Sequence, residues 1–116
     1  MDLETLIEDR VESILMEEPD IYAEYAILED EGTQSEWGII SLVDVEGRAL
    51  RFEVLETEIS WMREEAVDQY NEIADEGAPV LVVVPDEAFL AMSERLKKYG
   101  TPDVSLTSYG TIMEFA

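Results

Sequence analysis

The chain begins with apolar side chains at helical spacing. Six of them recur three or four residues apart between Asp2 and Glu18, interleaved with carboxylates: Leu3, Leu6, Ile7, Val11, Ile14 and Leu15. Such a stripe predicts one helix that buries a single face. Pro19 follows the last apolar position, and we expect the helix to end before it.

Three segments of strand type come next. Residues 21–28 carry apolar side chains on both faces, with Glu24 as the only charge on one of them. This composition favours a central strand. Residues 37–45 and 48–55 flank a short turn at Gly47, which predicts an antiparallel hairpin. The acidic stretch 29–36 is expected to form the loop before the hairpin.

The residues after the hairpin predict a helix and then a buried strand. We expect the helix to run from Ser60, as its cap, to Asp75, and to stop at Gly77. Residues 80–84 are a continuous run of valine and leucine. Such a run is typical of a strand buried on both faces and parallel to its neighbour.

The last part of the chain predicts a third helix and a final strand. Asp86 is expected to cap a helix over residues 87–99, which Gly100 terminates. Residues 104–109 read as a strand that could lie at an edge of the sheet. Residues 112–115 form a short apolar tail.

The predicted order is therefore helix, strand, strand, strand, helix, strand, helix, strand. A sheet begun by an antiparallel hairpin and extended by right-handed crossovers is an α/β three-layer sandwich with a mixed central sheet. The 116 residues fit one compact domain, residues 1–116, with a single well-buried core.

Acidic residues are spread along the whole chain. There are 29 Asp and Glu against 7 Lys and Arg, a net charge of -22. At molar salt the Debye length is only about 3 Å, so crowded carboxylates scarcely repel one another. We interpret the charge as adaptation to a salty archaeal or bacterial cytoplasm. Two alternatives stay open, namely acids that repel nucleic acid and acids that imitate the phosphates of DNA.

The composition excludes several kinds of site. The chain has no cysteine and no histidine, so disulfides, thiol chemistry, histidine-bound zinc and Ser-His-Asp triads are excluded. The longest apolar stretch, residues 78–85, is too short to span a bilayer, and the amino terminus is acidic. We therefore expect a soluble cytoplasmic protein that binds no membrane. No basic cluster exceeds Arg95, Lys97 and Lys98, which disfavours nucleic acid as a partner.

The order of elements, together with Gly47, Glu53, Tyr70 and Val82-Val83-Val84-Pro85, resembles the PD-(D/E)XK, or restriction-endonuclease-like, superfamily. The resemblance covers nearly the whole chain. It implies an Asp early in the second strand and a Glu-x-Lys on the third, which hold one or two divalent metals and a catalytic lysine. In such a site carboxylates bind Mg²⁺, which polarises the phosphodiester and activates the attacking water.

This chain matches the family's motif only in part. Glu53 stands at the position of the glutamate, but Leu55 stands where the lysine is expected. No carboxylate occurs near residues 38–40, where the Asp is expected, and Asp44 lies toward the end of the hairpin. Arg51 could replace the missing cation. The resemblance thus implies Glu53, Asp44 and Arg51 as catalytic residues, with Glu53 and Asp44 as metal ligands.

Other observations bear on the same residues. Strand alternation puts Arg51, Glu53 and Leu55 on one face of the strand, and Phe52, Val54 and Glu56 on the other. Read without the resemblance, Glu53 is expected on the solvated surface, and Arg51 is expected to pair with a nearby carboxylate. A further acid from the first helix, Glu8 or Glu12, could approach the sheet edge.

Three functional hypotheses follow. The favoured one is a degenerate, non-catalytic domain of nuclease-like fold that binds another protein or itself, through the strand 104–109 and the tail 112–115. The second is a Mg²⁺-dependent nuclease with a rearranged site at Glu53, Asp44 and Arg51. Convergence of these side chains would favour it, and burial of Leu55 would count against it. The third is an acidic mimic of DNA. No cofactor is expected except Mg²⁺ under the second hypothesis.

Overall fold

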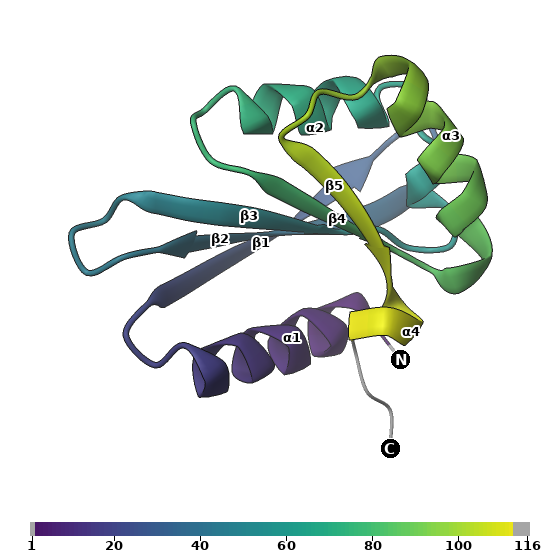
Figure 1. The fold of residues 1–116 in the computed structure, drawn as a ribbon. Coiled ribbons are helices and arrows are strands. Elements are labelled where there is room, and N and C mark those ends of the chain that lie inside the picture. The colour runs from purple at the N-terminus through teal and green to yellow at the C-terminus, as the bar shows by residue number, and fades with distance from the viewer. Residues whose placement is uncertain (1, 113–116) are drawn as a thin grey trace.

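The computed structural model describes residues 2–112 and is an α/β fold built on one five-stranded sheet (Figure 1). Its strands are β1 (Tyr22–Asp30), β2 (Ser35–Val43), β3 (Ala49–Leu55), β4 (Val80–Val84) and β5 (Val104–Ser108). They lie in the sheet in chain order. β1, β2 and β3 pair antiparallel, whereas β3, β4 and β5 pair parallel. The predicted α/β class with a mixed sheet is confirmed.

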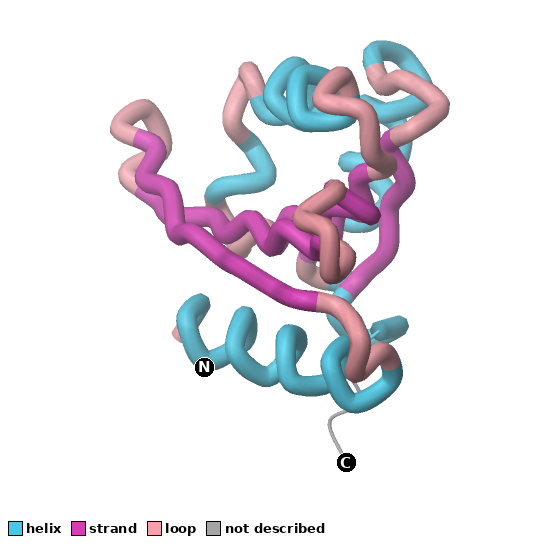
Figure 2. Tube along the Cα trace, turned by 90° about the vertical axis from the view of Figure 1, so that its left-hand side faces the viewer, coloured by secondary structure: helices cyan, strands magenta, loops and turns pink. Residues whose placement is uncertain are grey.

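Helices cover both faces of this sheet (Figures 1 and 2). One face carries α1 (Leu3–Glu17) and the short α4 (Tyr109–Ile112). The other carries α2 (Ala66–Ala74) and α3 (Phe89–Tyr99). Among the described residues, no helix combines the length and the apolar character that crossing a bilayer requires.

Each face of the sheet has its own apolar core, and β3 contributes to both. On the α1 side, Leu55 is buried with residues of α1, β2 and β4: Ile7, Ile14, Ile40, Leu42 and Val83. On the α2 side, Phe52 and Val54 belong to a larger cluster that includes Trp37, Tyr70, Val82 and Met92. The two faces expected from alternation along β3 are therefore observed.

Gly38 of β2 allows α1 to pack closely on the sheet. A Cβ atom at this position would lie 2.4 Å from Cδ1 of Ile7, which is fully buried. Real Cβ atoms do not approach other atoms so closely, so any larger residue would push α1 away from β2 or force Ile7 to another rotamer. The close packing of α1 on β2 therefore depends on the absence of a side chain at Gly38.

The expectation that the first strand is central was wrong. β1 is an edge strand, paired with β2 on one side only. Three of its large apolar side chains are exposed, with exposed fractions of 59% for Tyr22, 41% for Tyr25 and 38% for Leu28. The two-faced apolar pattern correctly described the side chains of this strand. It could not say how many neighbours the strand has.

The single helix expected from Ser60 to Asp75 was also wrong. A 3-10 turn spans Ser60–Met62, the backbone becomes extended at Arg63, and α2 begins only at Ala66. The physical reason lies in Arg63, whose side chain is directed into the protein and is only 1% exposed. In a continuous helix, Arg63 would have helical backbone angles, whereas here its backbone is extended and its side chain is directed into the protein.

Asp86 does not cap the third helix as expected. It begins a short 3-10 turn, Asp86–Ala88, and α3 starts at Phe89 without a side-chain cap. The Asp86 carboxylate instead accepts a hydrogen bond of 2.8 Å from the backbone N–H of Gly110 in α4. The last strand does lie at an edge, as β5, and the expected apolar tail falls largely on residues 113–116, outside the described residues.

Candidate functional site

Glu53 lies inside the protein, not on the solvated surface. It is 1% exposed, and its side chain is directed from β3 toward α1. Arg10 of α1 binds both carboxylate oxygens, with Nε–Oε1 at 2.7 Å and Nη2–Oε2 at 2.9 Å. A bidentate guanidinium occupies the directions in which this carboxylate would bind a metal ion.

Asp44 lies in the hairpin turn. Its Oδ1 accepts hydrogen bonds from the backbone N–H groups of Arg48, at 3.0 Å, and Glu46, at 2.9 Å, and these bonds lower its pKa. Glu53 pairs across the sheet with Ile40, four residues before Asp44. At about 3.3 Å per residue this separates Asp44 from Glu53 by roughly 13 Å along the strand. The structure does not bring these two carboxylates together.

Arg51 pairs with Glu18, just beyond the end of α1. Both guanidinium Nη atoms contact the Glu18 carboxylate, Nη1 at 3.2 Å from Oε1 and Nη2 beside Oε2. These hydrogen bonds raise the pKa of Arg51 and lower that of Glu18. The expected pairing of Arg51 with a carboxylate is therefore observed.

The remaining residues considered for the nuclease site also make contacts that do not form a metal site. Leu55 is fully buried in the α1-side core. Glu8 accepts a hydrogen bond of 3.3 Å from the Tyr25 hydroxyl, and it is Arg10 of α1, not Glu8 or Glu12, that reaches Glu53. Across residues 2–112 no group of three or more Asp or Glu is arranged to hold a metal ion.

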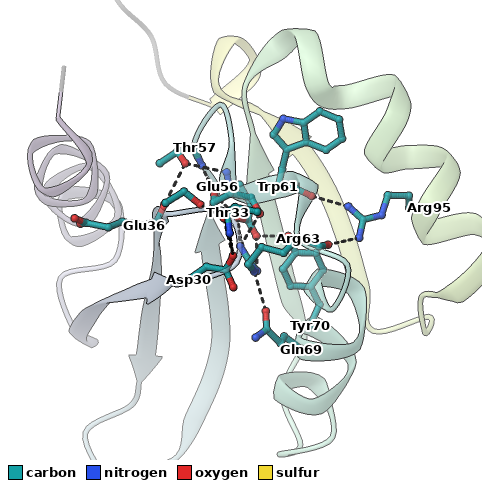
Figure 3. A network of polar contacts seen from close by, with 12 residues as sticks. Asp30, Thr33, Glu36, Glu56, Thr57, Trp61, Arg63, Gln69, Tyr70 and Arg95 are labelled. Carbon is teal, nitrogen blue, oxygen red and sulfur yellow. Dashed lines mark hydrogen bonds and ion pairs between the residues drawn. The ribbon is translucent and has the colours of Figure 1, made fainter.

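A buried polar network on the other face of β3 was missed from the sequence (Figure 3). Glu56, directly after β3, is fully buried. Its Oε1 accepts hydrogen bonds from the Ser60 hydroxyl at 2.6 Å and from Arg63 Nη1 at 2.7 Å. Its Oε2 accepts hydrogen bonds from Arg63 Nη2 at 3.1 Å and from the Tyr70 hydroxyl. Each carboxylate oxygen thus accepts two hydrogen bonds, as a buried charge requires.

The network connects α2, β2 and α4 to the end of β3. Arg63 donates from Nε to Gln69 Oε1 at 3.0 Å, and its guanidinium lies 4.2 Å from the centre of the Trp37 ring. The Tyr109 hydroxyl donates to the Glu56 carbonyl at 2.6 Å. Burial raises the pKa of Tyr70 well above its usual value, and the Glu56 charge adds to the effect. Strand alternation, which puts Glu56 on an inner face, was the one signal for this cluster.

A hollow of about 880 Å³ lies where β3 and β4 end. In open α/β sheets ligands commonly bind outside the carboxyl ends of parallel strands. Five carboxylates line this hollow and no cationic side chain does: Asp2, Glu36, Glu58, Asp86 and Glu87. Such a lining repels phosphate groups.

A second surface is formed by β1 and the adjoining side of α1. We call it the β1 edge surface and define it by six apolar residues: Val11, Leu15, Met16 and Tyr25 on the α1 side of the sheet, and Tyr22 and Leu28 on its opposite face. Four of them, together with Glu8 and Glu12, line a hollow of about 410 Å³. No described strand lies beside the outer edge of β1. Its outward backbone N–H and C=O groups are therefore available to another chain.

Comparison with known proteins places the chain in no family: no family model, no curated protein and no solved structure matches it. The functional inference therefore depends on the site geometry. This geometry offers two candidate sites. One is a set of carboxylates that already accept hydrogen bonds from arginine side chains or backbone N–H groups, and the other is the apolar outer edge of β1, which no described strand covers.

Proposed function

We propose that this chain is a non-catalytic domain that binds another protein through the outer edge of β1. The observation that carries the proposal is the exposure of large apolar side chains along an edge strand of nine residues. Single exposed apolar residues are common, but apolar side chains gathered along one edge mark a protein-interaction site. β1 has the composition of a central strand but pairs with only one strand, so a strand of another protein can pair with its free edge.

The other edge of the sheet supports this choice. Natural edge strands are protected when they are short, when they carry charged residues, lysine above all, or proline, or when a bulge twists them away. β5 has only five residues and exposes no large apolar side chain. β1 is nine residues long, pairs with β2 over nine positions without a bulge, and contains neither lysine nor proline, and its charged residues, Glu24, Glu29 and Asp30, are all acidic. β1 is therefore the edge suited to strand addition.

The geometry of the expected nuclease residues favours a non-catalytic role. Glu53 is bound by Arg10, Arg51 is paired with Glu18, and the Asp44 carboxylate accepts its hydrogen bonds within the hairpin turn. A leucine, Leu55, stands where the catalytic lysine is expected, and it is packed in the core. A metal-dependent nuclease would need carboxylates free to bind the ion.

We further propose that the fold is a degenerate form of the restriction-endonuclease-like fold. The order of elements along the chain supports this assignment, as does the place of Glu53 in β3. In this proposal the framework is retained and the metal chemistry is lost, since the arginine from α1 replaces the metal at Glu53.

The binding role is tested by selecting ligands for the intact chain from a random peptide library. We expect the selected peptides to shift the backbone amide resonances of residues 22–30 in an NMR titration. Binding should be lost in the double variant Tyr22→Ser/Leu28→Ser and kept in the control Leu90→Ser/Tyr99→Ser, which alters exposed side chains of α3. Ligands that bind the control poorly, or that map to another surface, would overturn the proposal.

The non-catalytic role is tested with duplex, single-stranded and branched DNA in Mg²⁺ or Mn²⁺, from low to molar KCl. We expect no cleavage by the chain or by Glu53→Gln. Metal-dependent cleavage that disappears in a folded Glu53→Gln variant would establish the nuclease alternative instead.

A further inference from the structure

We infer that the segment bound at β1 is an extended stretch of a basic protein, in which cationic residues alternate with apolar ones. This inference rests on the proposed binding function and names the chemistry of its partner. It depends on the charges beside β1, on the residues that line the hollow next to Tyr25 and on the alternation of side chains along a strand.

Three carboxylates form a row along α1 beside this edge. Glu4, Glu8 and Glu12 are spaced by four residues, which puts them on one side of the helix. The Tyr25 hydroxyl donates to Glu8 at 3.3 Å, and the pKa of Tyr25 is raised by desolvation and by the charges of Glu8 and Glu4. The row therefore lies close to β1 and makes its surroundings negative.

No cation of the described chain compensates this row. The single basic residue of α1, Arg10, is bound to Glu53 beneath the helix. None of the described salt bridges includes Glu4, Glu8, Glu12 or Glu24 of β1. Like charges four residues apart destabilise a helix, so a partner that carries cations would relieve a repulsion within α1 itself.

The hollow beside Tyr25 has a lining that suits a lysine or arginine side chain. Apolar side chains of Val11, Leu15 and Met16 line it together with the carboxylates of Glu8 and Glu12. Long basic side chains bury their methylene groups on apolar surface and keep the charged end in a polar environment. The ring of Tyr25 offers a further favourable contact to a cation.

The two sides of an added strand would meet different surroundings. On the α1 side, which Tyr25 shares through its pairing with Ile40, the new side chains meet the hollow and the row of carboxylates. On the opposite side they meet Tyr22 and Leu28, which are apolar and exposed, and the exposed carboxylate of Glu24 between them. Because successive side chains of a strand alternate between its faces, we expect cations at every second position of the partner and mainly apolar residues between them.

A second copy of this chain does not satisfy these requirements. Each copy carries a net charge of -22, so two copies repel one another at low salt, where the screening of their carboxylates is weak. β1 contains no lysine or arginine, and a second β1 would bring its own Glu24 and Glu29 to the edge. A basic partner is favoured on both counts.

The inference is tested with four synthetic peptides and the intact chain, by fluorescence anisotropy and NMR at low salt. One peptide alternates lysine and valine. The second has the same composition with the lysines in one block, the third alternates threonine and valine, and the fourth is the first with every second backbone amide methylated. We expect only the first peptide to bind tightly and to shift the amide resonances of residues 22–30.

Two charge-matched variants separate a specific site from general attraction. Glu8→Gln/Glu12→Gln should weaken binding of the first peptide by about tenfold or more. Glu72→Gln/Glu76→Gln, which removes two exposed charges near α2, should leave it nearly unchanged. Equal weakening in both variants, or equal binding of the blocked or methylated peptide, would overturn the inference.

Other outcomes separate this inference from the binding function itself. If the threonine–valine peptide binds β1 as tightly as the lysine–valine peptide, the strand edge binds proteins but not by charge. If library-selected ligands map to β1 while the lysine–valine peptide does not bind, the inference of a basic partner fails and the proposed binding function stands. A dimer that Tyr22→Ser/Leu28→Ser converts to a monomer would make a second copy the occupant and overturn the inference. If no ligand maps to β1, the inference and the proposed function both fail.

Discussion

Arg10 binds both carboxylate oxygens of Glu53, and this ion pair links α1 to the centre of the sheet. The two residues are 43 positions apart in the sequence. Removing one partner of a buried pair leaves an uncompensated charge. We expect Arg10→Met to lower the free energy of unfolding by about 3–5 kcal/mol, measured by urea denaturation. The double variant Arg10→Met/Glu53→Leu, which removes both charges, should recover most of this loss. A double variant as unstable as the single one would show that the pair contributes by packing, not by charge.

The network around Glu56 should be equally sensitive to loss of its cation. Arg63→Met leaves the buried Glu56 carboxylate with only the hydroxyl donors of Ser60 and Tyr70. We expect a loss of about 3–5 kcal/mol in the free energy of unfolding. Tyr70→Phe removes one donor and should cost about 1–3 kcal/mol. Because Arg63 lies over Trp37, tryptophan fluorescence of the folded state should change in Arg63→Met but not in Tyr70→Phe.

Gly38 should tolerate no side chain while Ile7 keeps its full length. We expect Gly38→Ala to lower the free energy of unfolding by about 1–3 kcal/mol, because the new Cβ meets Cδ1 of Ile7. Ile7→Val removes that atom. In the double variant the loss should be smaller than the sum of the two single losses, as measured in a double-mutant cycle. Additive losses would mean that another contact limits the position.

The pair between Glu18 and Arg51 predicts a pH dependence of stability. Arg51 holds the folded pKa of Glu18 below its ordinary value of 4.5. The stabilisation is therefore fully present above pH 4.5 and is lost as the pH falls through the folded pKa. We expect the difference in stability between the unchanged chain and Arg51→Met to shrink in acid. Lys98→Met makes the same change of charge at an exposed site of α3 and should give no such trend.

The net charge predicts a dependence on salt. Between about 0.01 M and 1 M salt the Debye length falls from roughly 30 Å to roughly 3 Å, which screens repulsion among the carboxylates. We expect the free energy of unfolding to rise with KCl, and to rise less steeply in the triple variant Glu4→Gln/Glu8→Gln/Glu12→Gln. Stability that is independent of KCl would contradict our interpretation of the charge as salt adaptation.

The sequence predicted those elements whose signal is local. The hairpin at Gly47, the valine-rich β4 and the amphipathic α1 were expected within a few residues of their observed bounds. Their patterns depend on side-chain period and turn residues, which are properties of short segments. For the same reason the two faces of β3 could be assigned before the partners of those faces were known.

The sequence could not predict features that depend on distant partners. The helix expected over 60–75 was wrong because Arg63 breaks its regular turns to reach Glu56, and nothing in the local pattern reports that contact. Glu53 was expected on the surface because its partner Arg10 lies on another element. β1 was expected to be central because its composition does not reveal the number of its neighbours.

The sheet has one further property, which follows from its strands lying in chain order. Each new strand pairs with the one made just before it, so no strand must be inserted between two that are already paired. The sheet can therefore grow in one direction while the polypeptide emerges from the ribosome. β1 is made first and remains outermost at every stage. We expect its free edge to be accessible from the first hairpin onward, long before synthesis of β5 is complete.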